Sequence, residues 1–219
     1  MKNKPTIAII GGTGKEGPGL ALRWALGGYP IIIGSREQEK AETTAEKLNK
    51  ELGINSITGM QNSLAAQNAD ISVLTVVYSA HQAALESIKD DLKGKLLIDA
   101  TARIDFRNPK PPEPPSAARI AQNILGEQVR VAAAFQNVPA HILRKDLNKS
   151  LEADVFVFAD TADTAEMAIS LAEAGGMRAY HAGGLDNAIV AEGLTSILIS
   201  LNKIYGVKTA SIGINGLNK

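Results

Sequence analysis

A glycine-rich segment near the N-terminus has a spacing that suits phosphate binding. Gly12, Gly14 and Gly17 fit the pattern G-x-G-x-x-G, between an apolar run and a segment of helical composition. Glycines so spaced permit a tight turn, bring backbone N–H groups close to a pyrophosphate and let a helix start against a strand. The pattern therefore predicts a dinucleotide site. An alternative, compatible with a bound phosphate, is a turn in which Thr13 and Glu16 form a capping box.

The end of the second expected strand indicates which nicotinamide cofactor would bind. An NAD site would place a carboxylate there, whereas this chain has Ser35 and Arg36, with Lys40 one helical turn further on. A serine hydroxyl, a guanidinium that donates two parallel hydrogen bonds and an ammonium can all bind a 2′-phosphate, so we expect NADP. The alternative is that Ser35 and Gln38 form a capping box and that the cations are solvated helix residues beside two glutamates.

Further candidates lie where the later strands are expected to end, since ligands of open α/β sheets bind there. They are Val76, Val77 and Tyr78, then Asp99 to Ala102, then Phe135 to Ala140. The apolar members would pack on the nicotinamide ring. Gln136, Asn137, Thr101 and Tyr78 would hydrogen-bond a polar substrate edge or, equally well, satisfy local backbone groups.

No side chain is singled out as catalytic. His81, His141 and His181 are far apart and lack companion motifs, so they favour structural roles over metal or acid–base chemistry. Cysteine is absent, which excludes thiol catalysis and cysteine-ligated metals. Hydride transfer between two bound rings fits this pattern because it requires proximity and orientation more than a proton donor.

The elements that must position these residues alternate along the chain. Strands are expected at Thr6–Ile10, Ile31–Ile33, Ile71–Val77, Leu96–Ile98, Val129–Ala133 and Val155–Phe158. Helices are expected at Leu20–Leu26, Arg36–Leu52, Ala80–Leu92, Ala117–Leu125 and Thr164–Ala174. Fully apolar strands separated by helices predict an α/β fold of the Rossmann type, with a doubly wound, mainly parallel sheet.

The C-terminal part has a different pattern. An apolar stripe with helical spacing comprises Leu194, Ile197, Leu198, Leu201, Ile204 and Tyr205. Such a helix could pack on its own domain, on a second subunit, or on both. We expect a Rossmann domain over residues 1–160 and a small helical domain over residues 161–219, which completes the substrate cleft and contributes to a homodimer.

Five prolines between Asn108 and Ser116 interrupt this regular alternation. Proline cannot enter a helix interior or a central strand and favours an extended path. We expect a stiff surface loop that borders the cleft, and an SH3-type ligand is the less favoured interpretation.

Composition excludes several classes of protein. The 219 residues carry 23 basic and 23 acidic side chains, so there is no net positive field for nucleic acid. The N-terminus lacks the long apolar region of a secretory signal, and no apolar run is long enough to span a membrane. We therefore expect a cytoplasmic protein that binds neither membrane nor nucleic acid.

Four segments together resemble the NADPH:coenzyme F420 oxidoreductases, also called F420-dependent NADP reductases. They are IAIIGGTGKEGPGLALRWA, GSREQEKAE, INSITGMQNSLAAQNADISVLTVVY and AGGLDNAIVAEGLTSILISLNKIYG. The likeness covers almost the whole chain. Other NADP-binding Rossmann proteins share the first segments more loosely, whereas ITGM combined with the AGGLDNA…E.LT…LN..YG tail is specific to this family.

The resemblance implies a reversible hydride transfer between C4 of the nicotinamide and C5 of the 5-deazaflavin F420, in which the protein orients the two rings. It places Thr13, Gly14, Lys15 and Glu16 on the phosphates and adenosine, and Ser35, Arg36 and Lys40 on the 2′-phosphate. It places Val76, Tyr78, Ala102 and Ala140 along the nicotinamide half, and Gln136, Asn137, Val138 and Pro139 against the deazaflavin. It also favours a homodimer.

Two features depart from the family pattern. Gln136 stands where some members have histidine, so no charged group is available at that place. The proline-rich stretch also differs, and nearby Arg103, Arg107 and Lys110 are candidates to contact the charged F420 tail. Alternatives are an NADPH-dependent reductase of another flavin, an imine or a small carbonyl compound, and a non-catalytic NADPH sensor.

Overall fold

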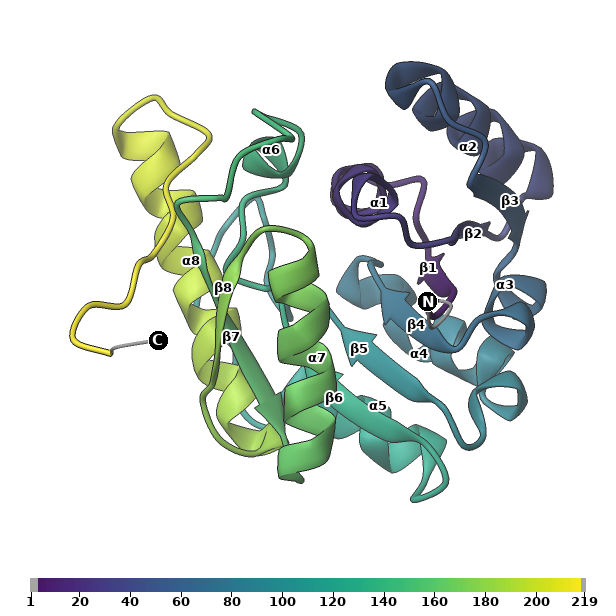
Figure 1. Cartoon of the computed structure of the whole chain (residues 1–219). Helices are drawn as coiled ribbons and strands as arrows, with labels where there is room; N and C mark the ends of the chain where they lie inside the picture. The colour runs from purple at the N-terminus through teal and green to yellow at the C-terminus, as the bar shows by residue number, and fades with distance from the viewer. Residues whose placement is uncertain (1–3, 218–219) are drawn as a thin grey trace.

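An eight-stranded sheet organises the chain in the computed structural model, which describes residues 4–217 (Figure 1). Its strand order is β3-β2-β1-β4-β5-β6-β7-β8, and every neighbouring pair is parallel except β6 with β7. The strands are β1 (Ile7–Ile10), β2 (Ile31–Ser35), β3 (Ile57–Gln61), β4 (Ile71–Leu74), β5 (Leu96–Asp99), β6 (Arg130–Ala133), β7 (Asp154–Ala159) and β8 (Arg178–His181). This order confirms the expected mainly parallel, doubly wound fold.

Both faces of the sheet are covered, which explains why its central strands are continuously apolar. In β1, Ile7 and Ile9 pack into one core, and Ala8 and Ile10 pack into the other. The first core is closed by α1 (Gly17–Leu26), α2 (Gln38–Leu52) and α7 (Ala162–Ala174). The second is closed by α3 (Asn62–Asn68), α4 (Tyr78–Ile88), α5 (Ala117–Leu125) and α8 (Ala188–Ile204).

Short elements complete the connections. A one-turn helix, α6 (Ala140–Leu143), follows the segment after β6, and 3₁₀ turns occupy Asp90–Leu92 and Leu185–Asn187. The proline-rich residues form part of the long connection from β5 to α5, as expected. The sheet continues across the expected domain boundary, because β7 pairs with β8. The division at residue 160 stays a prediction.

Sequence patterns located most elements but not all of them. β3, α3 and β8 were not anticipated, and the expected strand Ile71–Val77 ends earlier, at Leu74. The expected helix Ala80–Leu92 begins at Tyr78 and gives way to the 3₁₀ turn. β3 lies at the edge of the sheet and is only partly buried, so it lacks the apolar run that marks the inner strands.

A buried guanidinium connects α1 to two distant segments. Arg23 is 4% exposed and donates from Nε to the carbonyl of Leu143 at 2.8 Å, and from Nη2 to that of Lys145 at 2.9 Å. Its Nη1 donates to Lys149 at 3.1 Å and to Gly175 at 3.4 Å. Carbonyl dipoles replace the water that the cation loses on burial, so this one side chain holds the segment after α6 against α1.

Replacing Arg23 with methionine should destabilise the fold strongly. Methionine keeps much of the apolar stem but leaves several buried carbonyls without donors, so the free energy of unfolding should fall by about 3–5 kcal/mol. Urea unfolding followed by circular dichroism measures this. Lys47→Met, at an exposed position of α2, is the control and should change stability by less than about 0.5 kcal/mol. Equal effects of the two variants would contradict the role of Arg23.

Candidate functional site

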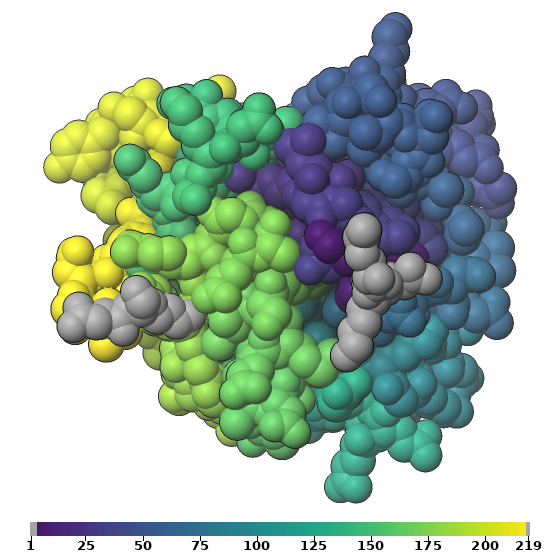
Figure 2. Space-filling view, viewed as in Figure 1, coloured from purple at the N-terminus to yellow at the C-terminus, as the bar shows by residue number. Residues whose placement is uncertain are grey.

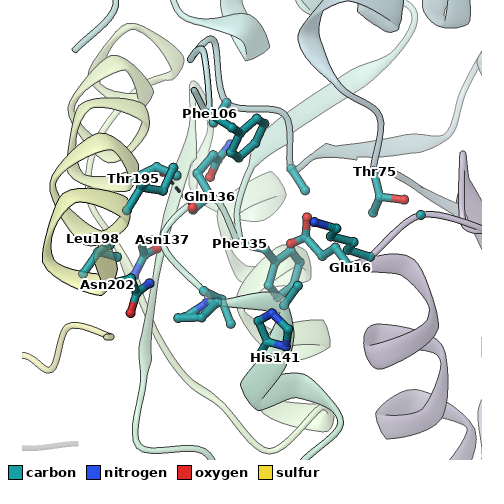
Figure 3. A pocket seen from close by; sticks show the side chains of 18 of the residues that line it. Glu16, Thr75, Phe106, Phe135, Gln136, Asn137, His141, Thr195, Leu198 and Asn202 are labelled. Atoms are coloured by element: carbon teal, nitrogen blue, oxygen red, sulfur yellow. Dashed lines mark hydrogen bonds between the residues drawn. The ribbon is translucent and has the colours of Figure 1, made fainter. Parts of the chain in front are cut away.

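A cavity of about 790 Å³ lies at the carboxyl ends of the strands (Figure 3). The glycine turn after β1 and the end of β4 form one side of it, and α8 forms the opposite side. It is lined by Gly14, Lys15, Glu16, Thr75, Val76, Val77, Ala100, Ala102, Phe106, residues 135–141, Thr195, Leu198, Ile199, Asn202, Val207 and Lys208. A volume of this size accommodates a large ligand or the reactive ends of two ligands.

The glycine turn has the form of a phosphate cradle. A Cβ on Gly17 would lie 2.5 Å from the carbonyl oxygen of Gly12, so α1 begins in backbone contact with the end of β1. Gly14 faces the cavity, and a Cβ there would have no neighbour closer than 3.6 Å. Packing therefore requires glycine at positions 12 and 17, whereas Gly14 leaves room for a phosphate beside the first turn of α1.

The capping box considered for Thr13 and Glu16 is wrong. Glu16 itself is the N-cap of α1, and no side-chain hydrogen bond caps the helix there. The carboxyl group of Glu16 instead lines the cavity, on the opposite side from α8 (Figure 3). The first N–H groups of α1 thus have no capping side chain to compete with a bound anion.

The three residues expected at the 2′-phosphate lie together at the end of β2. Ser35 is buried and its Oγ accepts from the N–H of Glu37 at 3.2 Å, whereas Arg36 is exposed. Lys40 forms an exposed ion pair with Glu37 at 2.6 Å. We refer to Ser35, Arg36 and Lys40 as the cationic corner. The carbonyl of Gly34, next to Ser35, accepts from the N–H of Gly12 at 2.9 Å, so the cationic corner adjoins the glycine turn. The alternative Ser35–Gln38 capping box is wrong, because Glu37 is the N-cap of α2 and has no side-chain cap.

The floor of the cavity starts with a strained residue after β6. Phe135 has φ of 78°, which is uncommon outside glycine, and its buried ring meets Trp24 edge-on at 5.9 Å. Gln136 follows; its Nε2 donates to the carbonyl of Asp99 at 2.8 Å, and its own carbonyl accepts from Thr195 Oγ1 at 2.7 Å. Gln136 Oε1 is buried and has no hydrogen-bond partner among residues 4–217.

Asn137, unlike Gln136, bonds to strand β7 with both ends of its side-chain amide. Its Nδ2 donates to the carbonyl of Asp154 at 2.6 Å, and its Oδ1 accepts from the N–H of Phe156 at 3.5 Å. Both ends of the amide are therefore used by strand β7, which fixes the turn beneath the cavity. Val138, Pro139 and Ala140 continue the lining as far as α6.

The structure brings most of the expected site residues to this cavity. Those that line it are Gly14, Lys15, Glu16, Val76, Ala102, Gln136, Asn137, Val138, Pro139 and Ala140. Those outside its lining are Gly12, Thr13, Gly17, Ser35, Arg36, Lys40 and Tyr78. The first three of these belong to the turn itself, and the next three form the cationic corner.

Tyr78 begins α4 at the rim. Its ring lies 5.8 Å from that of His81 and 5.1 Å from the guanidinium carbon of Arg103. His81 is buried and its Nε2 is 2.6 Å from Asp99 Oδ2, while Asp99 Oδ1 accepts from the N–H of Thr101 at 2.9 Å. This histidine therefore has the structural role that the sequence favoured, whereas His141 lines the cavity.

Sequence patterns missed the residues that join α8 to the rest of the site. Glu192 is fully buried; Oε2 accepts from the N–H of Arg103 and Oε1 from that of Ala117, both at 2.8 Å. Burial raises the pKa of Glu192 to about 6, although these two hydrogen bonds favour the ionised form. One carboxylate thus clamps both ends of the proline-rich connection, which carries Phe106 into the cavity.

Comparisons with known proteins place this chain in a family. Residues 6–103 match the family described as NADP oxidoreductase coenzyme F420-dependent. An F420-dependent NADP reductase from Methanothermobacter thermautotrophicus is 42% identical over 96% of this chain and 95% of its own length. The chain belongs to the F420-dependent NADP reductase family. A further F420-dependent NADP reductase, from Methanocaldococcus jannaschii, is 38% identical over 96% of this chain and 98% of its own length.

Solved structures agree with the fold of the F420-dependent NADP reductase family. A crystal structure from Arthrobacter sp. FB24, described as a candidate F420-dependent NADP reductase, has a TM-score of 0.81 and 24% identity, covering 97% of this chain and all of the other. Plasmodium falciparum pyrroline carboxylate reductase with NADP bound has a TM-score of 0.62 at 11% identity, covering 92% of this chain and 66% of the other. At these identities the likeness concerns the fold.

Metal-ligating clusters and membrane-spanning helices are both absent from residues 4–217. No group of three or more histidine, aspartate or glutamate side chains in this part of the chain could hold a metal ion. No helix within the same residues is long and apolar enough to cross a membrane.

Replacing Glu192 with glutamine should loosen this clamp. Glutamine has one acceptor oxygen, so one of the two backbone N–H groups loses its partner, and the free energy of unfolding should fall by about 1–3 kcal/mol. Thermal and urea unfolding at pH 7 measure the change. Glu166→Gln, on the exposed side of α7, should leave stability unchanged. A Glu192→Gln protein as stable as the wild type would show that the clamp contributes nothing.

Proposed function

We propose that this protein transfers a hydride reversibly between NADP(H) and coenzyme F420. The observation that carries the proposal is one continuous cavity, which joins the glycine cradle to a second wall formed by α8 and residues 135–140. The chemistry that NADPH supplies when bound is a hydride at nicotinamide C4. The protein's own contribution is to hold two planar groups in contact and exclude water, which can remove several kcal/mol from a barrier.

On the nucleotide side, the binding residues follow the course of the cleft. Residues Gly12 to Gly17 would hold the pyrophosphate, and Ser35, Arg36 and Lys40 would hold the 2′-phosphate. Val76, Ala102 and Ala140 offer small apolar surfaces where the nicotinamide ring would lie, and Tyr78 would close its rim.

On the opposite side, residues 136–139 and α8 would face the deazaflavin. The side chain of Gln136 donates to the carbonyl of Asp99, and the main-chain carbonyl of Gln136 accepts from Thr195. Its Oε1, unpartnered among the described residues, would accept a ring N–H of the deazaflavin without carrying charge. Asn137 supports the turn through β7, while Val138 and Pro139 add apolar contact. No side chain is assigned a proton-transfer role in the hydride step.

The proposal is tested by mixing purified protein with NADPH and oxidised F420. The absorbance of oxidised F420 should disappear together with that of NADPH, and the reverse reaction should run from reduced F420 and NADP. NADH should support the reaction poorly, because it lacks the 2′-phosphate. NADPH oxidation by a flavin, an imine or a carbonyl compound, without any F420 reduction, would contradict the proposal.

Arg36→Glu examines the cationic corner in the same assay. A carboxylate beside the 2′-phosphate should raise the KM for NADPH by about 100-fold, an effect of about 3 kcal/mol, and leave the KM for NADH nearly unchanged. Glu46→Gln, on the exposed side of α2, is the control and should leave both values unchanged. Equal effects of Arg36→Glu on the two cofactors would remove the assignment.

We also propose that the protein is a homodimer that pairs through α8. The apolar face of this helix is largely unburied in the single chain: Ile197 is 51% exposed, Ile204 is 74% exposed and the following Tyr205 is 72% exposed. Val190 and Leu201 lie on the same face of α8 and are also exposed. The end of α8 and the described segment after it, in yellow, lie at one edge of the molecule, away from α2 (Figure 2). Exposed apolar side chains in one continuous row favour burial against a second copy.

The double variant Ile197→Glu/Ile204→Glu tests the dimer. Light scattering at micromolar concentration should give twice the chain mass for the wild type and a single chain mass for the variant, because two charges would enter the apolar contact. Leu64→Glu, at an exposed position of α3, should remain dimeric. A wild-type protein with the mass of one chain would rule the pairing out. Cytoplasmic location stays a prediction from the sequence.

A further inference from the structure

The carboxyl group of Glu16 occupies an unusual place for an acidic side chain. It lies at the N-terminus of α1, within the glycine turn that forms the phosphate cradle. Its Oε1 is buried and has no hydrogen-bond partner among the residues that the structure describes. The side chain projects from the α1 side of the cavity toward Phe135, and Thr75 lies nearby (Figure 3). A carboxylate in this position would face the same space as a bound pyrophosphate.

Burial decides the charge of this group. It raises the pKa of Glu16 from 4.5 to about 8, because the ionised form loses its hydration without gaining a donor. At neutral pH most molecules therefore hold a neutral carboxylic acid here. A neutral acid has an O–H that can donate to a phosphate or carbonyl oxygen, whereas the carboxylate only accepts.

Other ionisable groups around the cavity do not compensate the charge. Lys15 precedes Glu16, His141 comes from α6, and Lys208 comes from the C-terminal segment; all three line the same cavity. None of them is hydrogen-bonded or ion-paired to Glu16 in the described part of the chain, and burial alone accounts for the raised pKa. Arg144, at the end of α6, is paired with Glu51 at 2.6 Å.

We propose that NADP binding is linked to a proton held by Glu16: the dinucleotide binds when this carboxyl is neutral, and ionisation of the carboxyl weakens binding. The inference rests on the proposed function only for the identity of the nucleotide. An ionised Glu16 would repel the two negative charges of a pyrophosphate bound beside it. Binding therefore favours the protonated acid, and at alkaline pH the complex takes up a proton as it forms.

The sign of the effect follows from this linkage. Below about pH 7 the free protein is already protonated at Glu16, so affinity should not change through this group. Above pH 8 the Kd should rise with every further pH unit, until the pH reaches the pKa that Glu16 has in the complex. This window lies above the second ionisation of a phosphate, so the charge of the 2′-phosphate changes little across it. The Glu16→Gln protein reports any pH dependence that comes from other groups.

The experiment measures NADPH affinity by its fluorescence from pH 7.0 to 9.5 at constant ionic strength. The wild-type Kd should be about tenfold higher at pH 9 than at pH 7. Glu16→Gln, which cannot ionise, should change by less than about twofold over the same range. Glu39→Gln, an equal change of charge on the exposed side of α2, should follow the wild type.

Calorimetry of the wild type tests the same linkage without any variant. NADPH binding at pH 8, measured in two buffers of different ionisation enthalpy, should show an uptake of about half a proton per nucleotide. Binding with no proton uptake and equal Kd at pH 7 and pH 9 would overturn the inference and leave the proposed function intact. A Glu16→Gln protein with the wild-type pH slope would also overturn it. Absence of NADPH binding at every pH would overturn both.

Discussion

The contact between the backbones of Gly12 and Gly17 is the constraint on which the site depends. A side chain at Gly17 would collide with the carbonyl of Gly12, so only glycine lets α1 start directly against the end of β1. That approach directs the first N–H groups of α1 into the cleft between β1 and β4, where the strand order reverses. It also sets the position of Arg23, whose guanidinium donates hydrogen bonds to the carbonyls of Leu143 and Lys145, at the end of α6 and just after it. Moving the start of α1 would therefore displace both the cradle and the segment after α6.

The second half of the cleft depends on buried polar groups rather than on close backbone packing. Glu192 fixes the two ends of the proline-rich connection to α8, and Thr195, one turn later, fixes Gln136. Burying a carboxylate is costly, and two backbone donors offset most of that cost. The benefit is geometric, since α8, the connection and the floor after β6 share one set of directional bonds. A purely apolar contact among these three segments would permit sliding, and two rings in van der Waals contact leave little room for it.

Local patterns and long-range contacts differ in how far the sequence reveals them. The glycine spacing and the cations after β2 are local patterns, and the structure has the glycines at the start of α1 and the cations at the end of β2. That these residues bind NADP stays a prediction. Both proposed capping boxes were wrong, because Glu16 turns into the cavity and the hydroxyl oxygen of Ser35 accepts from the N–H of Glu37. Glu192 was missed because its partners lie 75 and 89 residues away in the chain. Long-range pairings of this kind leave no periodic trace in a sequence.

The apolar stripe of α8 shows where a correct pattern has more than one structural meaning. Spacing alone places Leu194, Ile197, Leu198 and Leu201 on one face, yet Leu198 is 5% exposed and Ile197 is 51% exposed. The helix therefore uses one edge of its apolar stripe to line the cavity and leaves the other edge outward. Because both edges belong to one rigid helix, burial of the outer edge would restrict the same helix that holds Thr195 against Gln136. Pairing of two chains through α8 would in this way stiffen the wall that faces the second ring, which is a direct physical link between assembly and the precision of hydride transfer.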